Sequence, residues 1–195
     1  MSLQPEFRPH DPISQTDVEL NERDRKLLLA IAHAAIITAL DQRELDLTPP
    51  SPPLEQHRGV FTTLYLHETL RGCVGYVTPA VSLYRAVAET ARAAAFEDTR
   101  FPPVSRLEAP ELKVSLSVLS PLFEVSADQV EVGWHGLLIS QHGRRGLLLP
   151  QVPLEHGWGR VTFLEQTCRK AGLPLDAWRH GAKIEAFTAL VFGEA

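Results

Sequence analysis

The order of apolar and polar residues predicts a helix, then a proline-rich connection, near the start of the chain. In residues 21–40, apolar side chains recur at helical spacing and charged residues fill the first turns. Asn21 suits the start of this helix, because its side chain can accept a backbone hydrogen bond there. Residues 46–57 contain four prolines, which neither continue a helix nor donate to a sheet, so we predict a loop. The apolar positions of the helix are Leu27, Leu28, Ile31, Ala35 and Leu40.

From residue 60 the pattern changes to that of strands. Residues 60–66 and 73–77 are strand candidates, and the turn-like residues 67–72 between them make the group a predicted hairpin. A helix follows over residues 81–96, where alanines and larger apolar residues have helical spacing. Alternation of apolar residues with serines predicts a closing strand over residues 113–119.

A similar series occurs 74 positions further along the chain. It comprises a strand at 137–140, a turn at 141–146, a strand at 147–152, a helix at 159–170 and a strand at 185–192. The second series therefore has the same order of elements as the first.

Individual residues also match at this offset. Arg71 and Gly72 fall on Arg145 and Gly146. We therefore predict an α+β fold with internally duplicated hairpin, helix and strand units, which form a mainly antiparallel sheet flanked by helices. The two units can join edge to edge in one sheet, and a cleft between them would be a natural ligand site. The alternative is a chance similarity of common elements.

The domain prediction follows from this repeat. Residues 1–20 are expected to be a flexible N-terminal segment, and residues 21–195 a single domain. Its two quasi-repeats cover about residues 60–120 and 134–193.

Composition narrows the classes of function. A content of 44% hydrophobic and 22% charged residues is typical of a globular protein with one sizeable core. A net charge of −5 without a basic run argues against nucleic-acid binding. The sequence has no signal-peptide pattern and no apolar run of bilayer width, so we expect a cytoplasmic protein that does not bind membranes.

The segment Leu70–Gly75, with the sequence LRGCVG, combines a thiol, a guanidinium and two glycines. A guanidinium on the same side of a strand favours the thiolate, so Arg71 and Cys73 form a candidate reactive site. Cys73 corresponds to Leu147 in the repeat, however, and a free cysteine often serves as a small buried apolar residue. The recurring Arg71 and Gly72 have a structural alternative as turn residues, with glycine supplying a positive φ.

Several segments together resemble the AMMECR1 domain family. They are LRGCVG, AFEDTRFPPV at 95–104, VSLSVLSP at 114–121, WHGLLI at 134–139, GLLLPQV at 146–152 and EHGW at 155–158. The resemblance runs from the first helix to the C-terminus and implies an α+β fold with an antiparallel sheet and internal duplication. It implies no established activity, and the cofactor is unknown. Prokaryotic relatives are often encoded beside Memo-like and radical-SAM proteins, which implies partners in a shared pathway.

The resemblance also implies an active-site-like cleft at LRGCVG. The candidate catalytic residues are Cys73, His135 and Glu155, and the candidate ligand-binding residues are Arg71, Gly72, Gly75, Asp98, Arg100 and Gln151. Two positions differ from the family pattern. Thr99 replaces a common proline or serine, and Gly159 replaces a common aspartate, which leaves the second predicted helix without a side-chain N-cap.

Two classes of function remain open at this stage. In a cysteine-dependent enzyme, Cys73 is the nucleophile, His135 or Glu155 the base, and Arg71 or Arg100 binds an anionic group. In a binding or adaptor module, the same cleft recognises a partner protein or a small anion without turnover, and exposed tryptophans would contribute contacts.

Each polar candidate also has a structural interpretation. His135 can cap the end of a strand, and Glu155 can stabilise the start of the second helix. Asp98 and Arg100 can form an ion pair at the end of the first helix of the repeat. The histidines and the two cysteines lack the spacing of a metal site, so we predict no metal.

Overall fold

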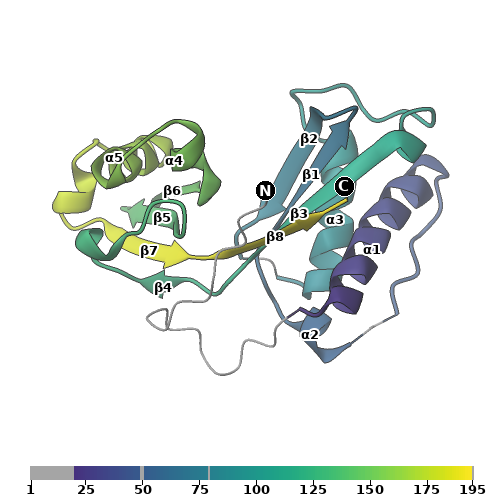
Figure 1. Ribbon diagram of the computed structural model, residues 1–195, viewed down its shortest axis with the longest axis horizontal. Coiled ribbons are helices and arrows are strands. Elements are labelled where there is room, and N and C mark those ends of the chain that lie inside the picture. Colours follow the sequence, from purple (N-terminus) through teal and green to yellow (C-terminus); the bar gives the residue numbers. More distant parts are fainter. Residues whose placement is uncertain (1–19, 49–50, 79, 195) are drawn as a thin grey trace. The chain divides into compact units, whose positions relative to one another are not determined.

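The computed structural model describes residues 20–48, 51–78 and 80–194, which form two compact units (Figure 1). The larger unit contains the described residues up to Leu119 together with residues 190–194, and the smaller unit contains residues 120–189. The segment predicted to be flexible, residues 1–20, lies outside the described residues except for Leu20, which is buried.

Helix α1 (Glu22–Leu40) begins where the sequence predicts. The Asn21 side chain accepts a hydrogen bond from the Asp24 amide at 3.0 Å, and the Asp24 carboxylate accepts one from the Asn21 amide, so the two form a capping box. The buried face of α1 includes Leu28 and Ile31, which belong to the core of the larger unit.

The proline-rich connection differs from the predicted loop. It contains the four-residue helix α2 (Pro52–Glu55), which has prolines in its first turn. Prolines are tolerated there, because the first amides of a helix have no intrahelical partner.

The larger unit has a four-stranded antiparallel sheet with strand order β2-β1-β3-β8 (Figure 1). Its strands are β1 (Val60–Leu66), β2 (Thr69–Tyr76), β3 (Leu112–Leu119) and β8 (Ala189–Gly193), and a 3-10 turn, η1 (Ala109–Glu111), precedes β3.

Helix α3 (Leu83–Phe96) packs on this sheet beside α1. Val60, Thr62 and Leu64 point toward the helices and are buried, and the Thr62 hydroxyl lies 2.8 Å from the Thr90 hydroxyl of α3. The alternating residues of β1 therefore lie on the face opposite α3.

The smaller unit has a second four-stranded sheet, with strand order β4-β7-β5-β6. Its strands are β4 (Phe123–Glu124), β5 (Gly136–Gln141), β6 (Arg144–Leu148) and β7 (Lys183–Phe187). Helices α4 (Gln151–Glu155) and α5 (Arg160–Lys170) and the 3-10 turns η2 (Ala127–Gln129) and η3 (Ala177–Arg179) complete it. Leu137, Ile139 and Phe163 lie in a core between β5 and α5.

The α+β prediction, with antiparallel sheets flanked by helices, is confirmed, but the strands form two sheets and not one. The strand predicted at 185–192 is divided into β7 and β8, which belong to different sheets. The division falls at Thr188, whose carbonyl accepts the Ser120 amide and whose amide donates to the Ser120 hydroxyl, both at 2.9 Å. These bonds lie where the chain leaves the smaller unit.

Both predicted turns are shorter than expected. The hairpin loops consist of His67 and Glu68 in the larger unit and of His142 and Gly143 in the smaller, and all four have positive φ. This is the conformation that two-residue hairpin loops favour. The remaining residues of the predicted turns belong to strands. The strand predicted at 147–152 ends at Leu148, and α4 takes its last residues.

The two units share a strand order, with the first strand of each hairpin in the middle. Gly72 pairs with Leu64, and Gly146 pairs with Ile139. The two glycines are 74 positions apart in the sequence, whereas their partners on β1 and β5 are one position further apart. The cause is a β-bulge at Arg71, which has no partner residue on β1. Duplication of the unit stays a prediction, which the shared strand order supports.

Candidate functional site around Cys73

Cys73 lies on β2, the edge strand, and pairs with Thr63 of β1. Since Thr62 faces α3, Thr63 and Cys73 lie on the opposite face of the sheet. Cys73 is half-buried, and its Sγ accepts a hydrogen bond from the Thr63 hydroxyl at 3.3 Å. The thiol therefore has a fixed donor and is partly accessible.

Asp98 and Arg100 hold the backbone of Cys73. The Cys73 amide donates to Asp98 Oδ2 at 2.9 Å, and an Arg100 Nη group reaches the Cys73 carbonyl at 3.4 Å. The two side chains are joined by an ion pair of 2.7 Å. Together they contact the amide and the carbonyl that point away from β1, as a neighbouring strand would, and thereby cover this part of the edge.

Asp98 and Arg100 stabilise each other in their charged forms, which shifts the pKa of each. The hydrogen bond from Arg100 lowers the pKa of Asp98 far below its usual range, although burial of the carboxyl opposes the shift and the Cys73 amide adds to it. The Asp98 side chain is only 6% exposed, whereas that of Arg100 is 57% exposed. Asp98 is therefore an ionised positioning group, while Arg100 presents a cation to solvent.

Arg71 makes a different set of contacts. Its guanidinium donates to Glu108 at 2.8 Å and to the carbonyls of Pro102 and Pro103, and the residue is buried. The hydrogen bond from Arg71 lowers the pKa of Glu108 to about 2. Arg71 therefore ties the loop after α3 to β2, and its role in ligand binding stays a prediction.

The bulge also corrects the residue matching made from the sequence. The structural counterpart of Arg145 is Leu70. Leu70 pairs with the residue that follows the partner of Gly72, and Arg145 pairs with the residue that follows the partner of Gly146. Arg71 is an additional residue, so its interpretation as a repeated turn residue was wrong. Cys73 and Leu147 remain counterparts, since they pair with Thr63 and Leu138 respectively.

The glycines of the motif serve close packing. A Cβ at Gly72 would lie 2.1 Å from the Ala94 carbonyl oxygen of α3, and one at Gly75 would lie 2.3 Å from the Phe61 ring. Neither glycine has a positive φ, so the predicted turn conformation of Gly72 is wrong. Absence of a side chain, and not backbone freedom, explains both positions.

The remaining candidates lie in the smaller unit. His135 directly precedes β5 and is buried, its Nδ1 accepts the Glu131 amide at 3.1 Å, and its ring meets that of Phe123 edge-on. These contacts agree with the strand-end interpretation of His135. Gln151 begins α4 and is half-buried, whereas Glu155 ends it and is exposed.

The structure thus divides the predicted site between the units. Cys73, Arg71, Gly72, Gly75, Asp98 and Arg100 belong to the larger unit, and His135, Glu155 and Gln151 belong to the smaller. Approach of His135 or Glu155 to Cys73 stays a prediction.

Sequence reasoning missed Thr63 and Glu108. Thr63 was part of a correctly predicted strand, but its contact with Cys73 depends on strand pairing that the pattern did not specify. Glu108 lies in an irregular segment, 37 residues from its partner Arg71, where periodicity gives no signal.

The other cysteine provides an internal contrast. Cys168 of α5 is fully buried, and burial raises the pKa of its thiol. It has the environment of a structural cysteine.

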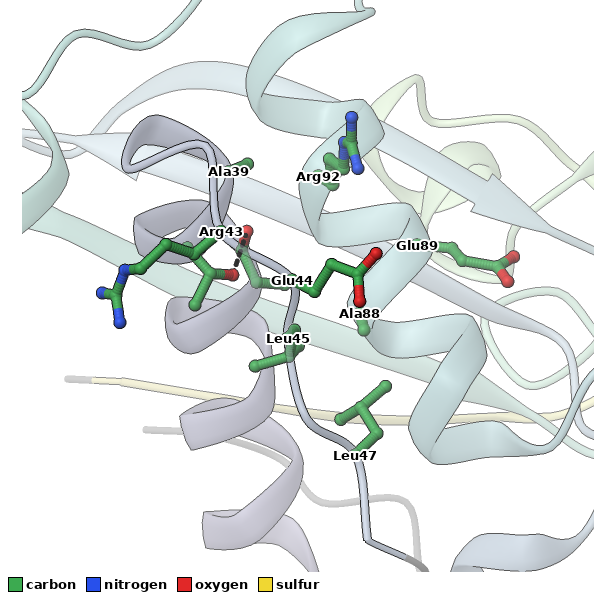
Figure 2. A pocket seen from close by; sticks show the side chains of 10 residues that line it. Ala39, Arg43, Glu44, Leu45, Leu47, Ala88, Glu89 and Arg92 are labelled. Carbon is green, nitrogen blue, oxygen red and sulfur yellow. Dashed lines mark hydrogen bonds between the residues drawn. The ribbon is translucent and has the colours of Figure 1, made fainter.

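A hollow of about 330 Å³ lies elsewhere in the larger unit, between α1, α3 and the chain after α1 (Figure 2). Leu45 and Leu47 line it together with small residues of both helices. Its charged residues are balanced in sign, and the Arg43 guanidinium already contacts Asp41 at 2.7 Å. They are Arg43, Glu44, Glu89 and Arg92.

The described residues offer neither a cluster of metal ligands nor a membrane-spanning helix. No group of three or more His, Cys, Asp or Glu side chains in the described ranges is arranged to hold a metal ion. None of the helices within those ranges combines the length and apolar character needed to cross a membrane.

Comparison with known proteins identifies the family. A family model described as AMMECR1 matches residues 29–192. The chain belongs to the AMMECR1 family. The match covers both units, so the family fold includes the Cys73 site and the smaller unit together.

Individual relatives agree along most of their length. The chain is 39% identical over 188 residues to protein MK0488 of Methanopyrus kandleri, covering 90% of this chain and 91% of that protein. It is 40% identical over 183 residues to protein TK0174 of Thermococcus kodakarensis, with coverages of 87% and 89%. The crystal structure of the uncharacterized protein PH0010 from Pyrococcus horikoshii matches with a TM-score of 0.75 and 38% identity, and the match covers 86% of this chain and 90% of that one. The AMMECR1 fold is thereby shown.

Proposed function

We propose that this AMMECR1-family protein is a cysteine-dependent enzyme in which Cys73 is the nucleophile. The observation that carries the proposal is the hydrogen bond from the Thr63 hydroxyl to Cys73 Sγ, on a half-buried thiol whose backbone is held by Asp98 and Arg100. A hydrogen-bond donor and a nearby guanidinium both favour the thiolate, which is the nucleophilic form.

The surrounding residues have distinct proposed roles. Arg100 binds an anionic group of the substrate, because its guanidinium is more than half exposed while Asp98 keeps it in place. Asp98 positions Arg100 and the Cys73 amide. The sequence-based assignment of His135 or Glu155 as the general base stays a prediction. The substrate belongs to a pathway shared with Memo-like and radical-SAM proteins, as the family resemblance implies.

A non-catalytic binding module is the second candidate. Its support is the pair Tyr65 and Leu70, which are paired across β1 and β2 and are each 37% exposed. They lie on the same face as Cys73, so this face combines apolar surface with the thiol. In this function the face binds a partner protein or a small anion without turnover.

Alkylation of the two cysteines tests the enzyme proposal. Iodoacetamide labelling followed by mass spectrometry measures both rates in one sample across neutral pH, with Cys168 as the buried control and glutathione as the reference thiol. We expect Cys73 to react about tenfold faster than glutathione, because a cysteine that acts as a nucleophile is more reactive than an ordinary thiol. Thr63→Val and Arg100→Gln should each reduce that rate.

Loss-of-function variants separate the two candidates. Alkylation of Cys73 no faster than glutathione, together with a Cys73→Ala variant that keeps the pathway phenotype, would exclude the enzyme. Loss of the phenotype in Cys73→Ser, with folding and partner binding retained, would exclude the adaptor.

A further inference from the structure

A second site candidate lies in the smaller unit, in a hollow of about 260 Å³ beside α5. Its walls come from β6, from the segment between α4 and α5, and from one side of α5. We name it the α5 pocket, and its lining residues are Leu148, Trp158, Gln166, Arg169 and Lys170.

The cations of the α5 pocket make no ion pair with the part of the chain that the structure describes. Arg169 and Lys170 are exposed at the end of α5, and neither forms an ion pair with any described residue. Glu165 lies one turn before Arg169 but makes no ion pair with it. By contrast, Arg71 and Arg100 of the larger unit contact carboxylates. The pocket therefore presents uncompensated positive charge.

Two further arginines lie on the neighbouring strand. Arg144 and Arg145 belong to β6 and also form no ion pair within the described part of the chain. Arg144 donates to the carbonyl of Gly172, just beyond α5. Gly146 packs so closely that a Cβ there would lie 2.7 Å from the Lys170 carbonyl carbon. Arg144 thus adds positive charge beside the end of α5, while Arg145, which is next to Gly146 in the strand, lies on the opposite face of the sheet.

The rest of the pocket lining is uncharged and mostly apolar. Trp158 is held on one side by His156, with the two rings stacked at 4.6 Å, and it packs against the core of the smaller unit. Leu148 adds an aliphatic surface, and the half-buried Gln166 offers an amide. The helix C-terminus favours Arg169 and Lys170, and the core holds Leu148 and Trp158, so the hollow brings cations and apolar side chains to one place.

We propose that the α5 pocket binds a small organic anion that carries a flat apolar group. The anionic group contacts Arg169 and Lys170, and the apolar group lies against Trp158 and Leu148. The charge-balanced hollow of the larger unit (Figure 2) lacks this excess of cations. The proposal goes beyond the function proposed for Cys73 and does not depend on it.

Binding of phenyl phosphate to the full chain tests the proposal. Calorimetry should show phenyl phosphate binding about tenfold more tightly than inorganic phosphate, because the ring adds contacts with Trp158 and Leu148. Benzoate distinguishes a carboxylate from a phosphate as the preferred anion. Arg169→Gln with Lys170→Gln should weaken phenyl phosphate binding about tenfold or more.

Matched variants locate the effect. Arg23→Gln with Arg92→Gln removes two exposed arginines of the larger unit, which changes the net charge equally and should leave binding unchanged. Phenyl phosphate should quench tryptophan fluorescence, and Trp158→Phe should remove the quench while circular dichroism confirms the fold. Equal binding of phenyl phosphate and inorganic phosphate, or equal weakening in both double variants, would overturn the proposal.

Discussion

The hairpins β1–β2 and β5–β6 occupy the same place in their sheets but carry different residues on the face away from the helices. In the larger unit, this face has the polar pair Thr63 and Cys73. In the smaller unit, the corresponding pair is Leu138 and Leu147. One common framework thus supports a polar site in one unit and an apolar pair, in which Leu138 is buried, in the other.

The two hairpins also differ by one residue, because β2 contains a bulge that β6 lacks. Arg71 occupies a bulge in β2 and binds Glu108, whereas Arg145 of β6 has a regular partner in Ser140 and is exposed. At the bulge, Arg71 is buried and forms an ion pair with Glu108. This ion pair holds the loop that contains Asp98 and Arg100 close to β2. The residues beside Cys73 therefore depend on a feature that the smaller unit lacks.

The largest expected effect concerns a feature that the two hairpins share. Gly72→Ala and Gly146→Ala should each lower the free energy of unfolding by about 3 kcal/mol or more, because the added Cβ meets helix backbone at 2.1 and 2.3 Å. All three tryptophans lie in the smaller unit, so tryptophan fluorescence should detect the Gly146 variant and circular dichroism should detect both.

Gly159→Ala is the control for both glycine variants. A Cβ at Gly159 meets nothing within 4 Å, so this change should cost no more than about 1 kcal/mol. Similar stabilities of all three variants would contradict the close packing inferred for Gly72 and Gly146.

The next effect distinguishes the two arginines. Arg71→Met should lower the free energy of unfolding by about 2–3 kcal/mol, because it leaves the Glu108 carboxylate and two carbonyls without their donor. Arg145→Met should change it by less than about 0.5 kcal/mol, since Arg145 is exposed and has no ion pair among the described residues. Urea unfolding at neutral pH measures both. Equal losses would show that the bulge has no special role.

A pH titration sharpens the same comparison. Arg71, with a smaller contribution from Ser105, lowers the pKa of Glu108 from 4.5 to about 2, so the stabilisation is complete above pH 4.5 and is lost as the pH falls toward 2. The stability difference between the parent protein and Arg71→Met should therefore be smaller at pH 3 than at pH 7. Arg145→Met should show no such trend. A constant difference for Arg71→Met would exclude Glu108 as the titrating partner.

The smallest expected effect lies at the start of α5. Gly159 is the N-cap residue, has an extended backbone and provides no side-chain hydrogen bond. Gly159→Asp should raise the free energy of unfolding of the smaller unit by a few tenths of a kcal/mol, through capping and the helix dipole. Thermal unfolding followed by tryptophan fluorescence measures the change. A decrease in midpoint would show that the added carboxylate is unfavourable there.

Local patterns predicted the regular elements well. The strand candidate at residues 60–66 has the observed ends of β1, and Asn21 marked the start of α1. The same reasoning placed Arg71 and Gly72 in a turn, because arginine and glycine suit turns, whereas tertiary packing against Ala94 requires the glycine within a strand. The break at Thr188 was also missed, since apolar alternation continues across it.

The candidate site was predicted only in part. The motif identified Cys73, Asp98 and Arg100, and the structure gives these residues mutual hydrogen bonds. Thr63 and Glu108 required the strand register and the path of an irregular loop. Such contacts arise between segments distant in the chain, and no local pattern encodes them.

The position of β8 has a consequence for the order of folding during synthesis. Residues 120–189 are made before residues 190–194, which complete the larger sheet. Until those last residues pair with β3, the outer edge of β3 is open. Contacts of the Glu194 carboxylate with the Val114 amide at 2.8 Å and with His33 then close that edge last. A chain halted before residue 190 would expose β3 to other chains, so pairing with β8 also protects this sheet from aggregation.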